Sequence, residues 1–574
     1  MKWSATILFL VSMLPLRAAN WLFKDGKSEY VIVIAPAASV SEQTAAAELR
    51  DYLKQISGVT LPVVHNLNAR GKHIYVGFND KVSALTGAAA PPDTAESFTY
   101  RTIGDDLLIY GGRNRGTMYG VYAFLERELG VMWLTSAHTR VPKQMRFALG
   151  KLNCCDGPVI RRRLDFYYEA LRHHDWTAHN LLNTQYLLAS TPYGEMSAYW
   201  GMHTFEVLIP PSRYFKSHPE FFSVKDGKRS DKAQLCLSNA KMRRELTKNL
   251  KETIAQNPGY WCYDVSQNDN GFPCECKNCR KLVEKYGGQS GAMLWFVNQV
   301  AADVKKVYPD IYVGTFAYWY TRQAPVGNIK AADNVVVRLC DIECCMAHPL
   351  EGCSQNRSFL NDMNNWRKRA KNIYIWDYTT GFSNYLLPFP NFDVLAANFR
   401  YFSRSNVIGI LEEGAHNTPW AEFSELKQWV IAKLLWNPYQ NTDSLSRLFI
   451  NNYYGKAAPY VWQYYNLCRK QVAENVHFTI SVDWNSALYC DKFVSDGLAL
   501  LLKAQKAVGK DTEMLKRTRR ITAQLYYLKL RRNTVKAATD NTLSAFKEII
   551  RSDNALIREN NYTLDDLLKD LHYY

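Results

Sequence analysis

Beyond its first twenty residues, the 574-residue sequence lacks any apolar run that approaches the length of a membrane-spanning helix. The N-terminal stretch is different: Lys2 precedes an apolar run from Ile7 to Leu16, and small residues follow at Ala18 and Ala19. This order is typical of a secretory signal peptide. We therefore predict a signal peptide at residues 1–19, export to the periplasm or the extracellular space, and no transmembrane segment after it.

The sequence also lacks the motifs of nucleic-acid binding, nucleotide binding and serine hydrolases. Its net charge is +16, but the 70 Lys and Arg residues are scattered, with no basic arm, zipper or recognition helix. The stretch GGRNRG at 111–116 has neither the lysine of a P-loop nor the spacing of a dinucleotide-binding turn. No G-x-S-x-G motif occurs. These absences argue against nucleic acid as a partner, whereas an anionic polysaccharide fits the basic charge.

The composition is that of a folded protein with several domains. The hydrophobic fraction is 47% and the charged fraction 22%, as in soluble globular proteins. At this length two or three domains are expected. Aromatic residues make up 13% of the chain, which suits a protein that stacks rings against sugars, although most of them are expected to fill cores.

Residues 20–150 are predicted to form a small α/β sandwich domain. Ser39 and Glu42 have the spacing of a capping box before a helix that Gly58 ends. A second helix is predicted over 116–130. Strand, helix, strand, strand and helix follow one another, and this order indicates an α/β layer structure. The predicted strands are 30–35, 73–78 and 106–112.

Residues 151–420 are predicted to form a (β/α)8 TIM-like barrel. Short apolar strands alternate there with helical segments, which is the pattern of this fold. From 421 to 574 the predicted elements are all helical, which indicates a helical C-terminal domain. The predicted barrel strands are 164–168, a segment near 202–205, 260–267, 311–318, 334–340, 372–379 and 407–414.

Carboxylates stand at the ends of several predicted barrel strands, where such barrels build their active sites. Glycosidic hydrolysis needs two carboxyl groups beside the bond, one protonated and one ionised. Asp269 and Glu412 are predicted to be acid and base or nucleophile, with Asp377 assisting and Glu343 as a fourth candidate in a loop. Because side chains alternate along a strand, only one of Glu412 and Glu413 can point into the site.

Polar and aromatic residues near the same strand ends are predicted to position a sugar. Arg338 lies inside an apolar strand and needs a partner, for which a catalytic Asp or a uronic acid on the substrate are the candidates. The predicted substrate-binding residues are His203, Gln267, Asn268, Tyr318, Arg338, Trp376, Tyr378 and Glu413.

The 13 cysteines include a C-x-C-x-x-C cluster at Cys274, Cys276 and Cys279. It offers three soft ligands where zinc normally takes four, so a structural zinc is one interpretation. Disulfides are the other, because an exported protein meets an oxidising compartment, although an odd count leaves at least one thiol unpaired. No cofactor is predicted apart from this zinc. Candidates for a fourth ligand are Cys262, Cys344, Cys345 and His348.

Several longer stretches resemble exported bacterial proteins of the uncharacterised domain family 4838. The resemblance rests on SEQTAAAELRDYLKQISGVTLPV and RGTMYGVYAFLERELGVMWL, and in the barrel on HPEFFSVKDGKR, QLCLSN, VSQNDNGFPCECKNC, VVVRLCDIECCMAHPL, IYIWDYTTGFSNYLLPFPN, LLWNPYQ and NNYYGKAAPY. It implies a first domain similar to the N-terminal domain of α-glucuronidases and β-hexosaminidases, followed by a glycosidase-like barrel with helical additions. Asp269, Asp377 and Glu412 match the acid and base of α-glucuronidases by position. The Asp-Glu pair of β-hexosaminidases is replaced by Asn268-Asp269, which departs from that mechanism.

Together these features predict an exported glycoside hydrolase, α-glucuronidase-like or hexosaminidase-like. Its carbohydrate substrate is a poly- or oligosaccharide, with uronic-acid-containing or otherwise anionic glycans as candidates. Two alternatives stay open: a non-catalytic carbohydrate-binding protein on a barrel scaffold, and a metal-dependent hydrolase or lyase that uses the cysteine-rich loops. The sequence makes no prediction of oligomeric state.

Overall fold

The computed structural model describes residues 20–188, 191–532 and 540–572, so the predicted signal peptide lies outside the described residues. Two compact units divide the chain. The first runs up to Val131 and includes Val141–Asp156, and the second comprises Met132–Arg140 and the chain from Gly157 onward. Among the described residues, no helix combines the length and the apolar character needed to cross a membrane.

The first unit is a mixed six-stranded sheet with three helices, as expected for an α/β domain. Helix α1 (Val40–Ser57) has the predicted capping box, and Gly58 ends it at a φ of +79°, where a side chain would be strained. The strands lie in the order β10 (Asn153–Asp156), β5 (Phe98–Ile103), β6 (Asp106–Gly111), β4 (Lys72–Val76), β2 (Tyr30–Ile34) and β3 (Val63–Val64). The remaining elements are α2 (Asp80–Thr86), α3 (Gly116–Arg127) and the pair β1 (Trp21–Lys24) and β9 (Arg146–Ala148).

The second unit contains a nearly closed barrel of eight parallel strands, which confirms the predicted fold class. Its two edges meet without a backbone ladder: the Asn183 side chain accepts a hydrogen bond from Arg163 N (2.9 Å) and donates to Arg161 O (2.8 Å). The strand order is β11 (Arg163–Phe166), β20 (Gly409–Glu413), β19 (Asn372–Tyr378), β18 (Val335–Cys340), β17 (Tyr312–Ala317), β16 (Cys262–Asp264), β13 (Ser197–Trp200) and β12 (Thr184–Gln185).

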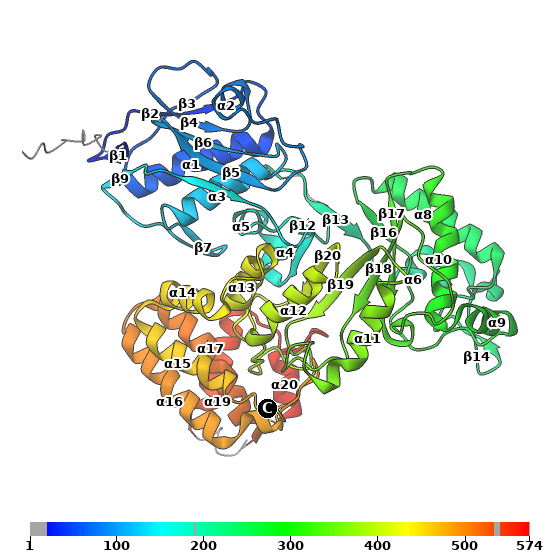
Figure 1. Cartoon of the computed structure of the whole chain (residues 1–574). Coiled ribbons are helices and arrows are strands. Elements are labelled where there is room, and N and C mark those ends of the chain that lie inside the picture. Colours follow the sequence, from blue (N-terminus) through cyan, green and yellow to red (C-terminus); the bar gives the residue numbers. More distant parts are fainter. Residues whose placement is uncertain (1–19, 189–190, 533–539, 573–574) are drawn as a thin grey trace, which may run out of the picture. The chain divides into compact units, whose positions relative to one another are not determined.

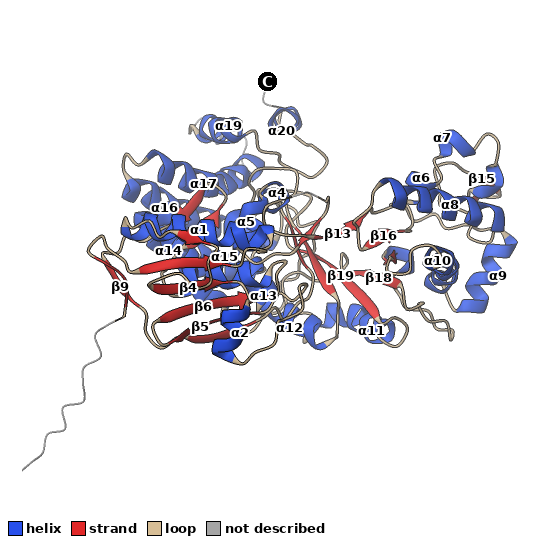
Figure 2. Cartoon of the chain, turned by 90° about the horizontal axis from the view of Figure 1, so that it is seen from above, coloured by secondary structure: helices blue, strands red, loops and turns tan. Residues whose placement is uncertain are grey.

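Helices follow most barrel strands, but the described residues that connect β12 to β13 and β17 to β18 include no α-helix. Figures 1 and 2 agree that α8, α9 and α10 lie together beside β16. The helices of this part are α4 (Tyr168–Arg172), α5 (His174–His179), α6 (Phe205–Leu208), α7 (Pro211–Tyr214), α8 (Ala240–Gln256), α9 (Lys277–Tyr286), α10 (Gln289–Lys305), α11 (Arg357–Trp366), α12 (Phe392–Arg404) and α13 (Ser424–Trp436). Three short 3-10 turns are η1 (Pro219–Phe221), η2 (Trp319–Thr321) and η3 (Ser354–Asn356), and two hairpins pair β7 (Met132–Thr135) with β8 (His138–Arg140) and β14 (Val224–Lys225) with β15 (Lys228–Arg229).

Helix α13 connects the barrel to the C-terminal helices and is buried on nearly every side. Its Lys427 is fully buried, pairs with Glu422 (2.9 Å) and donates to the carbonyl of Thr379 (3.1 Å), the residue after β19. These bonds fix the end of β19 against the helical layer. The helical layer consists of α14 (Thr442–Tyr454), η4 (Gly455–Ala457), α15 (Ala458–Arg469), η5 (Ala487–Tyr489), α16 (Asp491–Val508), α17 (Thr512–Arg532), α19 (Thr542–Asp553) and α20 (Leu564–Asp570).

The strand predicted near Met202–Phe205 is wrong. Strand β13 ends at Trp200, because the backbone turns left-handed at Gly201 (φ +80°) and His203 (φ +52°), and α6 begins at Phe205. Extended pairing cannot continue through these two residues.

Gly314 in β17 permits a close contact inside the barrel. A Cβ at this position would lie 1.6 Å from the hydroxyl oxygen of Tyr199. That hydroxyl donates to Asp264 (2.9 Å), and the Arg338 guanidinium lies 3.5 Å from the centre of the same Tyr199 ring. The ring therefore cannot move aside without disturbing a buried charge.

We expect Gly314→Ala to lower the free energy of unfolding by about 2 kcal/mol or more, because overpacking at this contact forces the Tyr199 ring away from Asp264. Gly271→Ala is the control, since no atom lies within 4 Å of a Cβ there. Denaturant unfolding of both variants measures the difference. Equal midpoints for Gly314→Ala and the unmodified protein would contradict this account of the interior.

Candidate active site

A cavity of about 230 Å³ lies at the carboxyl ends of barrel strands β17 to β20. This end of a (β/α)8 barrel is where such folds place their binding groups. Carboxylates, a histidine and several aromatic rings come together around it. The lining residues are Met202, His203, Asp269, Phe316, Tyr318, Cys340, Ile342, Trp376, Tyr378, Phe382, Glu413, Ile480 and Glu559.

Strand pairing aims Trp376, Tyr378 and Glu413 into this cavity. Trp376 and Tyr378 are two residues apart on β19 and so share a face, and Tyr378 pairs with Glu413 of β20 across the sheet. The Trp376 indole Nε1 donates to Glu413 Oε2 at 2.7 Å. Glu413 is therefore held in place by the neighbouring strand.

Glu413 is a protonated acid at neutral pH. Burial raises the pKa of its carboxyl from the ordinary 4.5 to about 8, and the negative charges of Glu559 and Asp269 act in the same direction against the Trp376 hydrogen bond. His416 Nδ1 lies 3.9 Å from Glu413 Oε1. The cavity thus contains a carboxyl group that can give up a proton near pH 8.

Asp269 lies in a contrasting, solvent-exposed environment on the loop after β16. The Tyr318 hydroxyl donates to its Oδ1 at 3.2 Å. Gln234 holds the loop on both sides of Asp269, because its Nε2 donates to the carbonyls of Asn268 and Asn270, each at 2.9 Å. Asp269 is therefore a fixed carboxylate with access to water.

His203 reaches the cavity from a strained backbone conformation, with φ at +52°. Its Nδ1 lies 2.8 Å from the Gln267 carbonyl, so Nδ1 carries a proton in that bond. The ring packs against Phe316 at 4.9 Å between centres. This residue lines the site as a hydrogen-bonding group next to an aromatic surface.

Glu559 was not predicted from the sequence. It lies in the loop between α19 and α20, where Asn417 Nδ2 donates to its carbonyl at 2.6 Å. Burial, then the charge of Asp269, raises the pKa of its carboxyl above the ordinary value. Its carboxylate lies within 4.8 Å of that of Glu413. No sequence signal marks this residue, because only tertiary packing brings the loop to the barrel.

Three predicted substrate-binding residues lie outside the lining and support the site from behind. Gln267 Nε2 donates to Thr321 Oγ1 (2.8 Å), and Asn268 Oδ1 accepts from the backbone of Glu206 (3.1 Å). Arg338 is buried among the rings of Tyr199, Phe316, Tyr374 and Trp376. The interior Asp264, which was not among the predicted catalytic residues, supplies negative charge near Arg338.

Glu343, a predicted catalytic candidate, is an ion-pair partner outside the cavity lining. Its carboxylate lies 2.9 Å from Arg322 Nη1, and Arg322 also contacts Asp362 at 2.9 Å. Both acceptors position the same guanidinium, which indicates a structural role.

Glu412 and Asp377, the other two predicted catalytic carboxylates, also lie outside the lining. They pair with each other across β20 and β19, and Asp165 of β11 pairs with Glu412 in the same row. Because side chains alternate, this row faces away from the side that carries Glu413. Glu412 is 0% exposed, and neither of its oxygens accepts a hydrogen bond from the described residues.

Burial raises the pKa of both carboxyls. For Asp377 the pKa reaches about 6, while bonds from Asp341 and from its own neighbour Tyr378 N (2.8 Å) favour the ionised form. For Glu412, burial and then the charges of Asp377, Asp341 and Asp165 raise the pKa well above 4.5. Glu412 is consequently a neutral, buried carboxylic acid.

Residues 133–466 match the family described as Domain of unknown function (DUF4838). The chain belongs to this family. The matched segment supplies every lining residue of the cavity except Ile480 and Glu559. The DUF4838 segment therefore contains Asp269 and Glu413, whereas Glu559 comes from the chain beyond it.

Two solved glycosidase structures are similar to this DUF4838 protein. A family GH115 4-O-methyl-α-glucuronidase with specificity for decorated arabinogalactans superposes with a TM-score of 0.57 at 11% identity, covering 92% of this chain and 77% of that one. A GH138 enzyme targeting pectin rhamnogalacturonan II gives a TM-score of 0.43 at 10% identity, covering 95% and 78%. No curated protein sequence matches. The first similarity shows a shared fold.

The neutral state of Glu412 makes the stability of the fold depend on pH. Above about pH 4.5 the unfolded chain releases the Glu412 proton, whereas the native state keeps it. The free energy of unfolding therefore falls as the pH rises from 4.5 toward the raised pKa of folded Glu412. Glu412→Gln, which cannot ionise, should make this decrease less steep. Denaturant unfolding between pH 4 and pH 9 measures it, with Glu284→Gln on the exposed surface of α9 as the control. Equal slopes in Glu412→Gln and the unmodified protein would show that Glu412 is ionised when folded.

Proposed function

We propose that this protein is a glycoside hydrolase whose acid is Glu413 and whose base or nucleophile is Asp269. The observation that carries the proposal is one cavity at the strand ends with two carboxyl groups in opposite environments. Glu413 is buried and protonated, whereas Asp269 is exposed and accepts a hydrogen bond from Tyr318. Paired carboxyl groups whose environments separate their protonation states are the requirement for this reaction.

In the proposed reaction Glu413 donates its proton to the glycosidic oxygen as the bond to the leaving sugar breaks. Asp269 either attacks the anomeric carbon or activates the water that does so. The rings of Trp376, Tyr378 and Phe316 provide apolar surface against the sugar face. Glu559 helps to keep Glu413 protonated through its charge.

This assignment replaces Glu412 and Asp377 with Glu413 and Glu559 as the acidic groups beside Asp269. It rests on strand alternation, which places Glu412 and Asp377 on the side away from the lining. The fold shared with a GH115 4-O-methyl-α-glucuronidase supports a glycosidase scaffold.

The lining favours a neutral sugar or an amino sugar at the cleaved position. Asp269, Glu413 and Glu559 contribute three carboxyl groups, and no Lys or Arg is among the described lining residues. A uronic acid would meet like charge there without a cationic partner. We therefore propose that any anionic group of the glycan binds away from this cavity.

A panel of aryl glycosides and oligosaccharides, including uronides and amino sugars, tests the proposal on the purified protein. We expect Glu413→Gln and Asp269→Asn each to lower kcat/KM by about 10²- to 10⁴-fold, because each removes one of the two required carboxyl groups. Glu412→Gln and Glu343→Gln are matched controls that should keep most of the activity. Cleavage that survives in both site variants, or is lost only in Glu412→Gln, would contradict the assignment.

Two other outcomes of the same panel favour the alternatives. Glycan binding without cleavage, unchanged in both variants, would indicate a carbohydrate-binding protein. Ligand atoms of Glu413, His416 and Glu559 lie within 4.8 Å of one another, so a divalent cation is the second candidate at this site. Activity that a weak chelator removes and a divalent metal restores, together with metal content that falls in His416→Ala, would favour a metal-dependent hydrolase at this site.

A further inference from the structure

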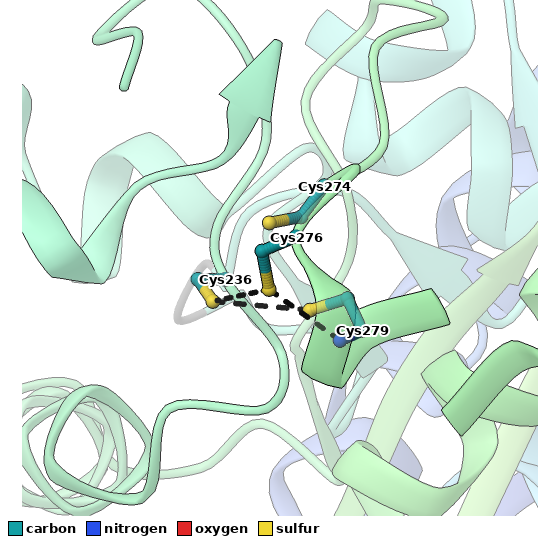
Figure 3. Close-up of side chains that lie close together, drawn as sticks. All are labelled: Cys236, Cys274, Cys276 and Cys279. Atoms are coloured by element: carbon teal, nitrogen blue, oxygen red, sulfur yellow. Dashed lines mark hydrogen bonds between the residues drawn. The ribbon is translucent and has the colours of Figure 1, made fainter. Parts of the chain in front are cut away.

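Four cysteine side chains from two separate segments meet beside the loop that carries Asp269. Cys236 precedes α8, whereas Cys274, Cys276 and Cys279 form the C-x-C-x-x-C cluster at the start of α9. Figure 3 shows the sulfur of Cys236 turned toward those of Cys276 and Cys279, with Cys274 next to them. All four Sγ atoms lie within 4.8 Å of one another.

The sulfur separations fit a tetrahedral metal site and not a disulfide. Cys236 Sγ lies 3.7 Å from Cys276 Sγ and 3.8 Å from Cys279 Sγ. Zinc bound at about 2.3 Å by four thiolates places sulfurs about 3.8 Å apart. A disulfide requires about 2.05 Å.

The surroundings of the four sulfurs favour thiolate ligands. Backbone N–H groups donate to them, from Cys279 to Cys276 Sγ at 3.4 Å and from Val224 to Cys274 Sγ at 3.3 Å. Cys276 caps the N-terminus of α9, where the helix dipole stabilises negative charge. Such backbone donors orient metal-bound cysteines and stabilise their charge. We propose that Cys236, Cys274, Cys276 and Cys279 bind a structural zinc ion.

Cys236 was not among the predicted fourth ligands. Cys262 lies in β16 inside the barrel core, and Cys344 is not among the four clustered cysteines. Cys345 and His348 belong to a second group of candidate ligands. Because 37 residues lie between Cys236 and Cys274 in the sequence, only the fold brings Cys236 to the motif.

This zinc would fix both sides of the loop that carries Asp269. Gln234, two residues before Cys236, binds the carbonyls of Asn268 and Asn270, and Cys274 lies five residues after Asp269. The ion would therefore link the segment of Gln234 and Cys236 to the end of the Asp269 loop, which has no regular secondary structure. This positioning role rests on the proposed function, but the metal site itself does not.

An independent set of ligands, Cys345, His348, Cys353 and His477, has the composition of a Cys2His2 site. Cys345 Sγ lies 3.6 Å from His348 Nδ1 and 3.2 Å from His477 Nδ1, and Cys353 Sγ lies 3.8 Å from His477 Nδ1. Tetrahedral zinc with bonds of about 2.3 Å to sulfur and about 2.1 Å to nitrogen requires about 3.6 Å. Four candidate donor atoms thus surround one point.

A hydrogen bond to the backbone orients His348 as a ligand. His348 Nε2 lies 3.2 Å from the carbonyl of Ala473, so Nε2 donates there and Nδ1 is left unprotonated toward Cys345. The geometry points to a second zinc, which joins the loop after β18 to the segment between α15 and α16. Ile480 of that segment lines the cavity.

Metal analysis of the purified full-length chain by mass spectrometry tests both sites. We expect two zinc ions per chain after dialysis against a weak competing chelator, one in Cys236→Ser, one in Cys345→Ser, and none in the double variant. Cys490→Ser, an exposed cysteine outside both sets, should keep two. The readout is independent of glycan cleavage, so its failure would leave the proposed hydrolase untouched, and the reverse also holds.

Pulsed alkylation of the unmodified protein keeps the test decisive if a variant does not fold. The six proposed cysteine ligands should resist alkylation until a strong chelator removes the zinc, and should then react. They are Cys236, Cys274, Cys276, Cys279, Cys345 and Cys353. Disulfide-linked peptides among these cysteines would overturn the proposal. It would equally be overturned by zinc content that Cys236→Ser and Cys345→Ser leave at two, or by iron in place of zinc.

Discussion

Alternation of side chains along β19 and β20 determines which acidic residues of this barrel meet the cavity. Trp376, Tyr378 and Glu413 fall on one side of the sheet, and Asp377 and Glu412 on the other. A shift of one residue in the pairing of these strands would exchange the two sets. The hydrogen bond from the Trp376 indole to Glu413 depends on the same register. The register of these strands therefore decides which carboxyl group can act in the proposed chemistry.

The same cavity gives its carboxyl groups different environments. Glu413 is enclosed by the strand ends and keeps its proton, because burial and two neighbouring carboxylates all disfavour its charge. Asp269 projects from an exposed loop and has a phenolic donor. That loop has no regular structure, so side chains such as Gln234 and, in our proposal, a zinc ion determine its position. The segments between the C-terminal helices contribute as well, since Glu559 and Ile480 complete the wall.

The sequence predicts the barrel, the capping box of α1 and six of the thirteen lining residues. Each of these features depends on residues that are close together in the chain. The sequence does not predict which side chains of the last strand face the cavity, since GILEEG is compatible with either Glu412 or Glu413 pointing inward. Glu559 and Cys236 were missed for another reason. Both reach their partners through long-range packing, by a C-terminal loop in one case and by the segment before α8 in the other. A one-dimensional pattern does not contain such contacts.

The proposed acid must hold a proton at neutral pH, so the ionisation of Glu413 is the measurement to make. Infrared difference spectroscopy of the unmodified protein against Glu413→Gln isolates the signal of this one carboxyl group across a pH titration. We expect a protonated carboxyl that ionises at about pH 8, and an ionisation at lower pH in Glu559→Gln, where one neighbouring charge is removed. Ionisation of Glu413 near pH 4.5, as in an exposed glutamate, would contradict it.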